Sequence, residues 1–203
     1  SAFGWDQENA TNINPYIDKT YYYINVGSTP GKRIQTLAEP AGAPTTTITQ
    51  FHEYQYHELD ETNIVRLGRK WYGDRFDINP NQTFRFNFPR MDVSQPVLLK
   101  VFAAAASSST TTMPVILNGT QVDNLVFPAA TGISLAREDS FTGSVNVSNT
   151  ELSIDLNYNN SGNPSSDAYL DFISIEAVSD LRSLGQQFGF KNNTVGGLVG
   201  IGE

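Results

Sequence analysis

The residues best suited to acid–base chemistry are two histidine–glutamate pairs in one short stretch. His52-Glu53 and His57-Glu58 each place an imidazole next to a carboxylate. General acid–base catalysis requires such groups to converge within hydrogen-bond reach of one substrate atom. The two histidines are five residues apart in a stretch that predicts a β-strand, and an odd separation puts them on opposite faces. We therefore expect surface histidines here and no catalytic pair.

The composition also argues against catalysis. The 203 residues include no cysteine and only two histidines, which excludes a cysteine nucleophile, a disulfide and a thiolate metal site within the chain. Thirteen Lys and Arg stand against 21 Asp and Glu, a net charge of −8, so no basic face for nucleic acid is expected. No run of about 20 apolar residues predicts a transmembrane helix. The composition predicts a soluble, acidic, non-catalytic domain.

Acidic residues near the ends of predicted strands raise the question of a calcium site. Glu138-Asp139, Asp167 and Asp171 have the oxygen ligands that Ca²⁺ prefers. A dedicated calcium loop has closely spaced acids with a glycine, and this pattern is absent from the sequence. We expect solvated acids in turns and no cofactor, with a structural calcium as the alternative.

Aromatic and glycine-rich segments give two further candidates. Residues 21–23 and the Trp71-Tyr72 pair could form a platform for stacking sugars, although aromatic residues in strands usually pack in the core or in cross-strand pairs. The glycine-rich residues 196–200 lack the Lys-Ser/Thr ending of a phosphate loop. They are expected to be a flexible connector.

The elements that position these residues are predicted to be strands. Apolar and polar residues alternate over 152–158, and Asn118-Gly119 between two apolar runs predicts a type I′ hairpin. Residues 168–178 are apolar on both faces, as in a central strand. Strands recur every ten to fifteen residues, which predicts an all-β fold, an antiparallel β-sandwich of jelly-roll type with very little helix.

The chain divides into three predicted parts. Residues 1–44 form an N-terminal segment that we interpret as the remnant of an upstream module. Residues 45–181 form the sandwich, and residues 182–203 form a connector towards a missing downstream domain. Within the sandwich, residues 60–70 have room for a turn or two of helix.

Three blocks in this order resemble a known family. Residues 14–23 contain Asn-Pro-Tyr followed by three tyrosines, residues 63–76 contain Gly-Arg-Lys-Trp-Tyr-Gly-Asp-Arg-Phe, and residues 168–173 contain Leu-Asp-Phe-Ile. Together they resemble the region ahead of the peptidase domain in the PorU sortases of type IX secretion, gingipain-like cysteine peptidases of Bacteroidetes. Asp74 and Phe172 stand where that family usually has glutamate and tyrosine.

The resemblance singles out a set of motif residues with structural roles. They are Gly68, Arg69, Trp71, Gly73, Asp74, Phe76, Leu170 and Asp171. The two glycines of the second block let the backbone turn on either side of a large anchor, so we expect Trp71 to fill a gap in the core. We expect Arg69 to pair with an acid such as Asp74 or Asp171, with a binding role as the alternative.

The resemblance implies a function that belongs to a larger protein. The family's catalytic Cys-His pair lies in a downstream domain, so no catalytic residue carries over to this chain. The chain is then expected to be a non-enzymatic accessory or docking domain of a peptidase that processes secreted proteins and attaches them to the cell surface. Its expected partners are its own peptidase domain and outer-membrane secretion proteins, at the outer-membrane surface of a Bacteroidetes bacterium. The alternative is a carbohydrate-binding or adhesion module of jelly-roll type.

Overall fold

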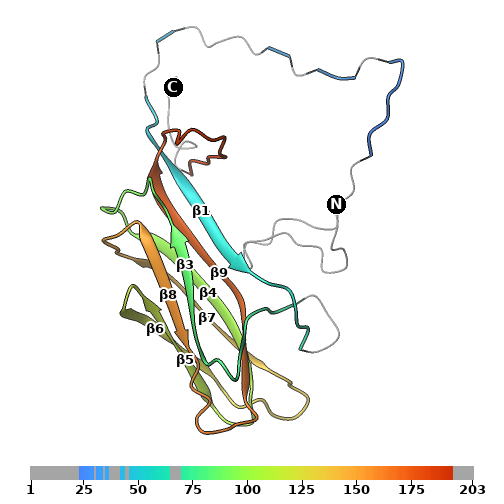
Figure 1. Cartoon of the computed structure of the whole chain (residues 1–203), viewed down its shortest axis with the longest axis vertical. Coiled ribbons are helices and arrows are strands. Elements are labelled where there is room, and N and C mark those ends of the chain that lie inside the picture. Colours follow the sequence, from blue (N-terminus) through green and yellow to red (C-terminus); the bar gives the residue numbers. More distant parts are fainter. Residues whose placement is uncertain are drawn as a thin grey trace.

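Two antiparallel sheets make up the folded part of the chain (Figure 1). The computed structural model describes residues 23–29, 31–33, 35–36, 42–43, 46–64 and 70–193. The strands are β1 (Gln50–Glu58), β2 (Arg75–Phe76), β3 (Asn81–Asn87), β4 (Val97–Ala106), β5 (Thr111–Leu117), β6 (Thr120–Phe127), β7 (Arg137–Val145), β8 (Glu151–Asn157) and β9 (Asp167–Asp180). No helix occurs in the described residues, which include 60–64 and 70 of the stretch where a helical turn was expected.

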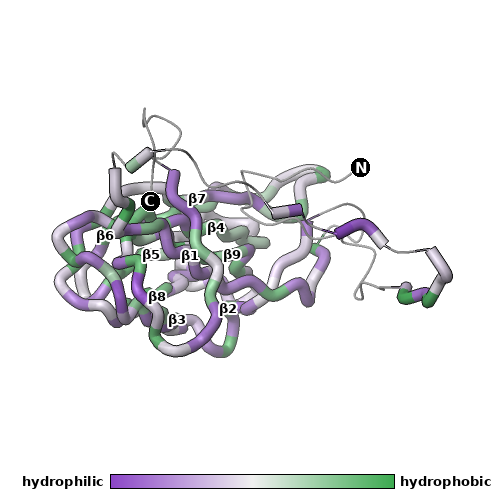
Figure 2. The backbone as a smooth tube through the Cα atoms, turned by 90° about the horizontal axis from the view of Figure 1, so that it is seen from above, coloured by the Kyte–Doolittle hydropathy of each residue, from purple (hydrophilic) through white to green (hydrophobic). Residues whose placement is uncertain are grey.

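The order of the strands is that of a jelly roll. One sheet has the order β1-β9-β4-β7, with β2 also paired to β9, and the other has the order β3-β8-β5-β6. Seen from above, the two sheets form two rows of strands (Figure 2). The first and last long strands are neighbours in one sheet, and the chain passes repeatedly between the sheets. The predicted all-β sandwich of jelly-roll type is confirmed.

The local patterns explain why these strands form. In β8 the buried residues alternate with partly exposed ones, so one face lies on the core and the other towards solvent. The hairpin between β5 and β6 turns at Asn118 and Gly119, whose φ angles are 48° and 81°. Both angles are positive, as a type I′ turn requires, and Asn and Gly adopt this conformation most readily.

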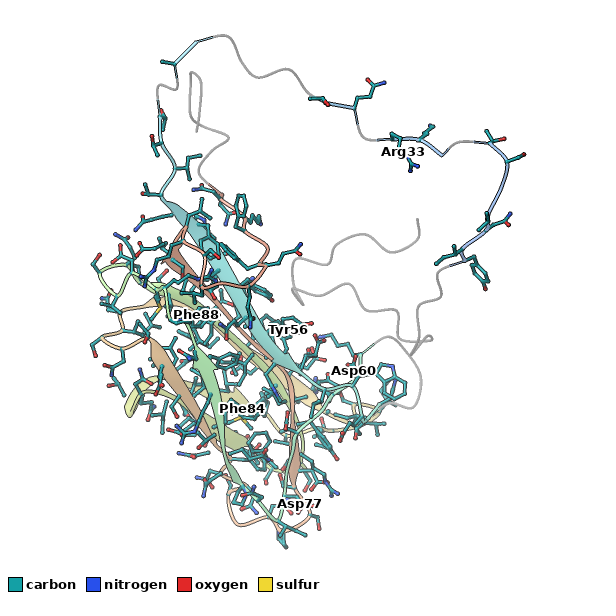
Figure 3. All side chains as sticks on the ribbon, turned by 45° about the horizontal axis from the view of Figure 1, so that its top comes forward. Arg33, Tyr56, Asp60, Asp77, Phe84 and Phe88 are labelled. Carbon is teal, nitrogen blue, oxygen red and sulfur yellow. The ribbon has the colours of Figure 1, made fainter. Side chains whose placement is uncertain are left out.

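The core lies between the sheets. Its buried side chains come from every strand except β1 and β7, and β3 with the residue after it supplies Phe84, Phe86 and Phe88, of which Phe84 and Phe88 are labelled in Figure 3. The other sheet contributes Leu99 and Val101 from alternate positions of β4. Burial of this apolar surface is the main driving force of folding.

Strand β9 differs from the other strands because it is buried on both faces. It lies between β1 and β4, and an irregularity in its register with β4 falls between Phe102 and Ala103. Phe172 is fully buried but points away from the core, and its ring stacks on Phe102 with centroids 4.7 Å apart. A second layer of packing therefore covers this sheet on its outer side. The prediction of a central strand at residues 168–178 is confirmed.

Residues beyond β9 fold back along β1. The Leu181 amide donates to the carbonyl of Thr49, and the His52 amide donates to the carbonyl of Lys191. Phe188 lies beside Phe51, with ring centroids 5.6 Å apart. The described part of the expected connector thus contacts the sandwich, while the three-part division of the chain stays a prediction. In the part of the chain that the structure describes, no helix is long and apolar enough to cross a membrane.

Candidate functional site

The candidate site is the face of the five-stranded sheet that is turned away from the core, called the outer face below. The register places Tyr54 and Tyr56 of β1 in rows with Glu176 and Ser174 of β9. The row that contains Tyr56 and Ser174 continues to Lys100 of β4, which lies opposite Ser174. This part of the outer face is polar and aromatic, in contrast to the apolar core on the opposite side of the sheet.

One end of the outer face is covered by a segment that we call the covering loop, residues 59–64 and 70–74. Thr62 and Tyr72 exchange hydrogen bonds of 2.8 Å across the two halves of this loop. The Gly73 amide donates to the carbonyl of Leu170, and the Leu170 amide donates to the carbonyl of Asp74. These bonds attach the covering loop to β9.

Gly73 is required where the covering loop closes on itself. A Cβ at this position would lie 2.4 Å from Cβ of Leu59 and 2.7 Å from its carbonyl oxygen. Only a residue without a side chain allows this approach, which is a different requirement for glycine from the turn beside Trp71 that the sequence suggested.

Tyr72 lies across the sheet and joins the covering loop to the opposite edge strand. Its ring is 6.5 Å from that of Tyr169, and its hydroxyl donates to Oε1 of Glu138 at 2.5 Å. Tyr169 and Glu138 are the neighbours of Ala104 on either side, so the small side chain of Ala104 leaves room for the ring. Tyr72 is only 4% exposed, and burial, with the hydrogen bond to Glu138, raises its pKa far above the usual range.

Glu138 accepts a second bond from the covering loop. Nζ of Lys70 lies 2.7 Å from Oε2 of Glu138. Burial opposes ionisation of the carboxyl, but the hydrogen bonds from Lys70 and Tyr72 outweigh it, and the pKa of Glu138 is lowered. Glu138 is therefore a structural anchor for the loop.

His57 is held by a carboxylate, which the sequence analysis did not predict. Its Nε2 lies 2.7 Å from Oδ2 of Asp74, and its ring packs on Phe84 with centroids 4.8 Å apart. The expectation of a simple surface histidine is wrong for His57, because the covering loop brings Asp74 across the end of β1. The pair connects the loop, β1 and β3, and a chain without cysteine offers it no thiol to activate.

A second buried ionic group lies at the other end of β1. Arg90 is 8% exposed, and its guanidinium lies 3.3 Å from Glu53 and over the rings of Phe51 and Phe188 at 4.9 and 4.2 Å. Arg90 also donates to the carbonyl of Arg182 at 3.3 Å. This cluster holds residues beyond β9 against β1, and its chemistry is that of packing and charge pairing.

The remaining predicted motif residues have different positions. Gly68 and Arg69 lie outside the described residues. Phe76 and Leu170 are fully buried in the core, and Asp171 is 8% exposed. Trp71 does not fill a gap in the core as predicted: it is half-buried in the covering loop, because its neighbour Tyr72 is the residue that turns onto the sheet.

The acids considered for calcium have protein partners in the structure. Glu138 binds Lys70 and Tyr72, Asp139 accepts from the amide of Val126 at 2.7 Å, and Asp167 pairs with Arg75 at 2.9 Å. Across the described residues, no three His, Cys, Asp or Glu side chains gather in a way that could hold a metal ion.

Tyr54 and Tyr56 form the most accessible aromatic pair on the outer face. They are 39% and 56% exposed, and their rings stack with centroids 5.9 Å apart at 29°. Partial burial raises the pKa of Tyr54, although the hydrogen bond with Ser174 opposes the shift. Glu176 lies in the same row as Tyr54 and accepts a hydrogen bond from the Asn193 amide group at 3.2 Å.

Comparisons with known proteins give a structural likeness only. No protein-family model matches the sequence, and no curated protein matches it. The crystal structure of dimeric latent PorU from Porphyromonas gingivalis matches 76% of this chain with a TM-score of 0.62 and 20% identity. The match spans 15% of the PorU chain. At this identity the likeness shows a shared fold, and it supports the predicted resemblance at that level.

Carbohydrate-binding modules also resemble the chain more distantly. A family 36 module in complex with calcium and xylotriose matches 61% of this chain and 98% of its own, with a TM-score of 0.38 and 15% identity. A family 35 module from Clostridium thermocellum matches 60% of this chain and 90% of its own, with a TM-score of 0.36 and 14% identity. Likenesses this distant carry no functional argument.

Proposed function

We propose that the chain is a non-catalytic accessory domain of an exported, PorU-like cysteine peptidase that processes and attaches secreted proteins at the cell surface. The observation that carries this proposal is the match to PorU, which covers most of this chain and only a small part of that one. A small β-sandwich within a large chain is typical of a domain that braces or positions another. The proposed location is the outer-membrane surface of a Bacteroidetes bacterium.

The chemistry of the chain supports a role without catalysis. The sequence contains no cysteine, and the imidazole of His57 is engaged by Asp74 in a structural contact. The proposed partners are the peptidase domain of the same protein and outer-membrane secretion proteins. We assign no cofactor to the domain.

The gene provides the most direct test. We expect the reading frame to continue beyond Glu203 into a gingipain-like domain with a Cys-His pair. A reading frame that stops at Glu203 would contradict the proposal.

A binding experiment tests the accessory role itself. The purified chain, immobilised on a sensor, should bind the separately purified peptidase domain encoded with it and hydrolyse no peptide on its own. An unrelated jelly-roll domain serves as the control surface. Peptide hydrolysis by the chain that survives substitution of both histidines would rule out the proposal.

A second candidate function is carbohydrate binding on the outer face. The exposed Tyr54–Tyr56 pair beside Ser174, Glu176 and Lys100 combines aromatic faces with hydrogen-bonding groups, as sugar platforms do. Calorimetry with a panel of oligosaccharides tests this function. Binding that disappears in Tyr56→Ala would support it, and no heat with any sugar would favour the accessory role.

A further inference from the structure

The outer face of the five-stranded sheet differs in composition from the solvent face of the other sheet. Two rows of side chains cross it, and they are Tyr54, Glu176, Leu98 and Ser144 in one row and Tyr56, Ser174, Lys100 and Thr142 in the other. Their two charges have opposite signs. The solvent-side residues of the β3–β8 pair include no aromatic residue and three charged ones, Arg85, Glu151 and Asp155. Tyrosine enrichment and few charges are typical of the centre of a protein interface.

Tyr54 and Tyr56 are well placed to anchor a partner. Their rings stack on each other while both side chains stay exposed. Because stacking already orders the two side chains, their immobilisation on binding costs little conformational entropy. Tyrosines that become buried at an interface often contribute a large share of the binding free energy.

Lys100 adds a requirement for charge complementarity. It lies in the same row as Tyr56 and Ser174, and it forms no ion pair with another residue in the part of the chain that the structure describes. An acidic side chain of a partner would complement it.

The described chain ends on this same face. Residues 182–193, red in Figure 1, lie beside the start of β1. Phe188 packs on Phe51, which points to the core side of β1 because it alternates with the outward residues. The Asn193 side chain then donates to Oε1 of Glu176 at 3.2 Å, and its amide donates to Nδ1 of His52 at 3.2 Å. The segment therefore passes around β1 from the core side to the outer face.

This path places whatever follows in the chain beside the two tyrosines, since Glu176 is the register partner of Tyr54. A short tether raises the effective concentration of the attached domain to about the millimolar range, so a modest interface is enough to keep it docked. Interfaces between domains of one chain commonly bury about 600–1,500 Å². The solvent face of the four-stranded sheet lies on the opposite side of the sandwich and has no such tether.

We propose that the outer face is the docking surface for the domain that follows in the same protein, with Tyr54 and Tyr56 as its anchors. The proposal rests on the proposed function, which makes that domain the peptidase. The docked domain covers both rings and sets an acidic side chain against Lys100. Residues 188–193 fix the starting point of the connection, because Asn193 is bonded to the face itself.

Photo-crosslinking in the full-length protein encoded by the gene tests the surface directly. Benzoyl-phenylalanine replaces Tyr56 in one variant and Arg85, exposed on β3, in the matched control. After irradiation and digestion, mass spectrometry should find cross-links from position 56 to peptides of the peptidase domain and none from position 85. Equal cross-linking from both positions, or cross-links from position 56 only to residues of this chain, would overturn the proposal.

Affinity measurements separate this proposal from the accessory role. With the chain on the sensor and the purified peptidase domain in solution, we expect Tyr56→Ala and Lys100→Glu each to weaken binding about tenfold or more. Arg85→Glu is the matched charge reversal and should bind like the parent. A parent and three variants that bind equally well would overturn the docking surface and leave the accessory role standing, whereas a parent that does not bind contradicts both. Binding of an oligosaccharide through Tyr56 in the full-length protein would also overturn the proposal, because docking covers that ring.

Discussion

Strands β8 and β9 are both central in their sheets, yet they are buried in different ways. In β8 only the residues that face the core are fully buried, and the other side remains partly exposed. In β9 six consecutive residues, from Leu170 to Ile175, are buried. The difference arises because the covering loop and the ring of Phe102 lie over β9 on the outer face, whereas the described residues place no comparable layer over β8.

This contrast shows where the fold has been extended beyond a plain sandwich. A sheet with one solvated face needs only alternating residues, and the four-stranded sheet follows that rule. The five-stranded sheet instead carries Phe172, Tyr169 and Ala104 on its outer face. There Phe172 stacks on Phe102, and the ring of Tyr72 lies 6.5 Å from that of Tyr169. The covering loop and the paired tyrosines both belong to this sheet, so we expect its outer side to hold the function.

The largest expected effect tests whether the outer face of the five-stranded sheet is buried while that of the four-stranded sheet is exposed. Phe172→Ala empties a fully buried site on the outer face and should lower the free energy of unfolding by about 3–5 kcal/mol. Arg85→Ala, which removes an exposed side chain from the solvent side of β3, should change it by less than about 0.5 kcal/mol. Urea denaturation followed by fluorescence measures both. Similar losses of stability in the two variants would show that the outward faces of the two sheets do not differ in burial.

A smaller effect is expected where the covering loop closes. Gly73→Ala forces Leu59 away from its present position and should lower the free energy of unfolding by about 1–3 kcal/mol. Gly189→Ala is the matched control, since nothing lies within 4 Å of the added Cβ, and it should unfold like the parent. Thermal melting of the three proteins compares them. If Gly73→Ala melts with the control, the loop does not approach Leu59 this closely in solution.

The hydrogen bond between Tyr72 and Glu138 provides a further test of how firmly the covering loop is held on the outer face. Tyr72→Phe keeps the ring over Ala104 and removes only the hydroxyl that donates to Glu138. We expect a loss of about 1–2 kcal/mol in the free energy of unfolding near neutral pH, the value of a hydrogen bond to a partly exposed charge. Denaturant titration at pH 7 measures it. An unchanged midpoint would mean that water replaces the hydroxyl without loss.

The smallest expected effect is a dependence on pH. The folded state lowers the pKa of Glu138, so this carboxylate stabilises the fold above its unfolded pKa of about 4.3, and the contribution is lost as the pH falls further. Because the side chain is 50% exposed, solvent screening keeps the contribution below about 1 kcal/mol. Stability measured from pH 6 to pH 3 should fall less steeply in Glu138→Gln than in the parent. Parallel curves would show that the carboxylate contributes nothing specific to the fold.

Local patterns in the sequence were sufficient to predict the strands and the β-sandwich that they form. Alternation over residues 152–158 predicts a strand with one buried face, and Asn118-Gly119 predicts the hairpin, because both depend on neighbours within a few residues. The two-faced apolar pattern at residues 168–178 likewise predicts a central strand.

The contacts that the covering loop makes depended on distances along the chain that no local pattern encodes. His57 meets Asp74 and Tyr72 meets Glu138 across separations of 17 and 66 residues, and only the folded sheet brings them together. The choice between Trp71 and Tyr72 as the buried aromatic shows the same limit. Both are large and adjacent, and the direction of the loop over Ala104 selects Tyr72. Side-chain chemistry and short-range periodicity thus specify the strands and their turns, whereas packing against a sheet assembled from distant segments selects which side chains of the covering loop meet which residues of the sheet.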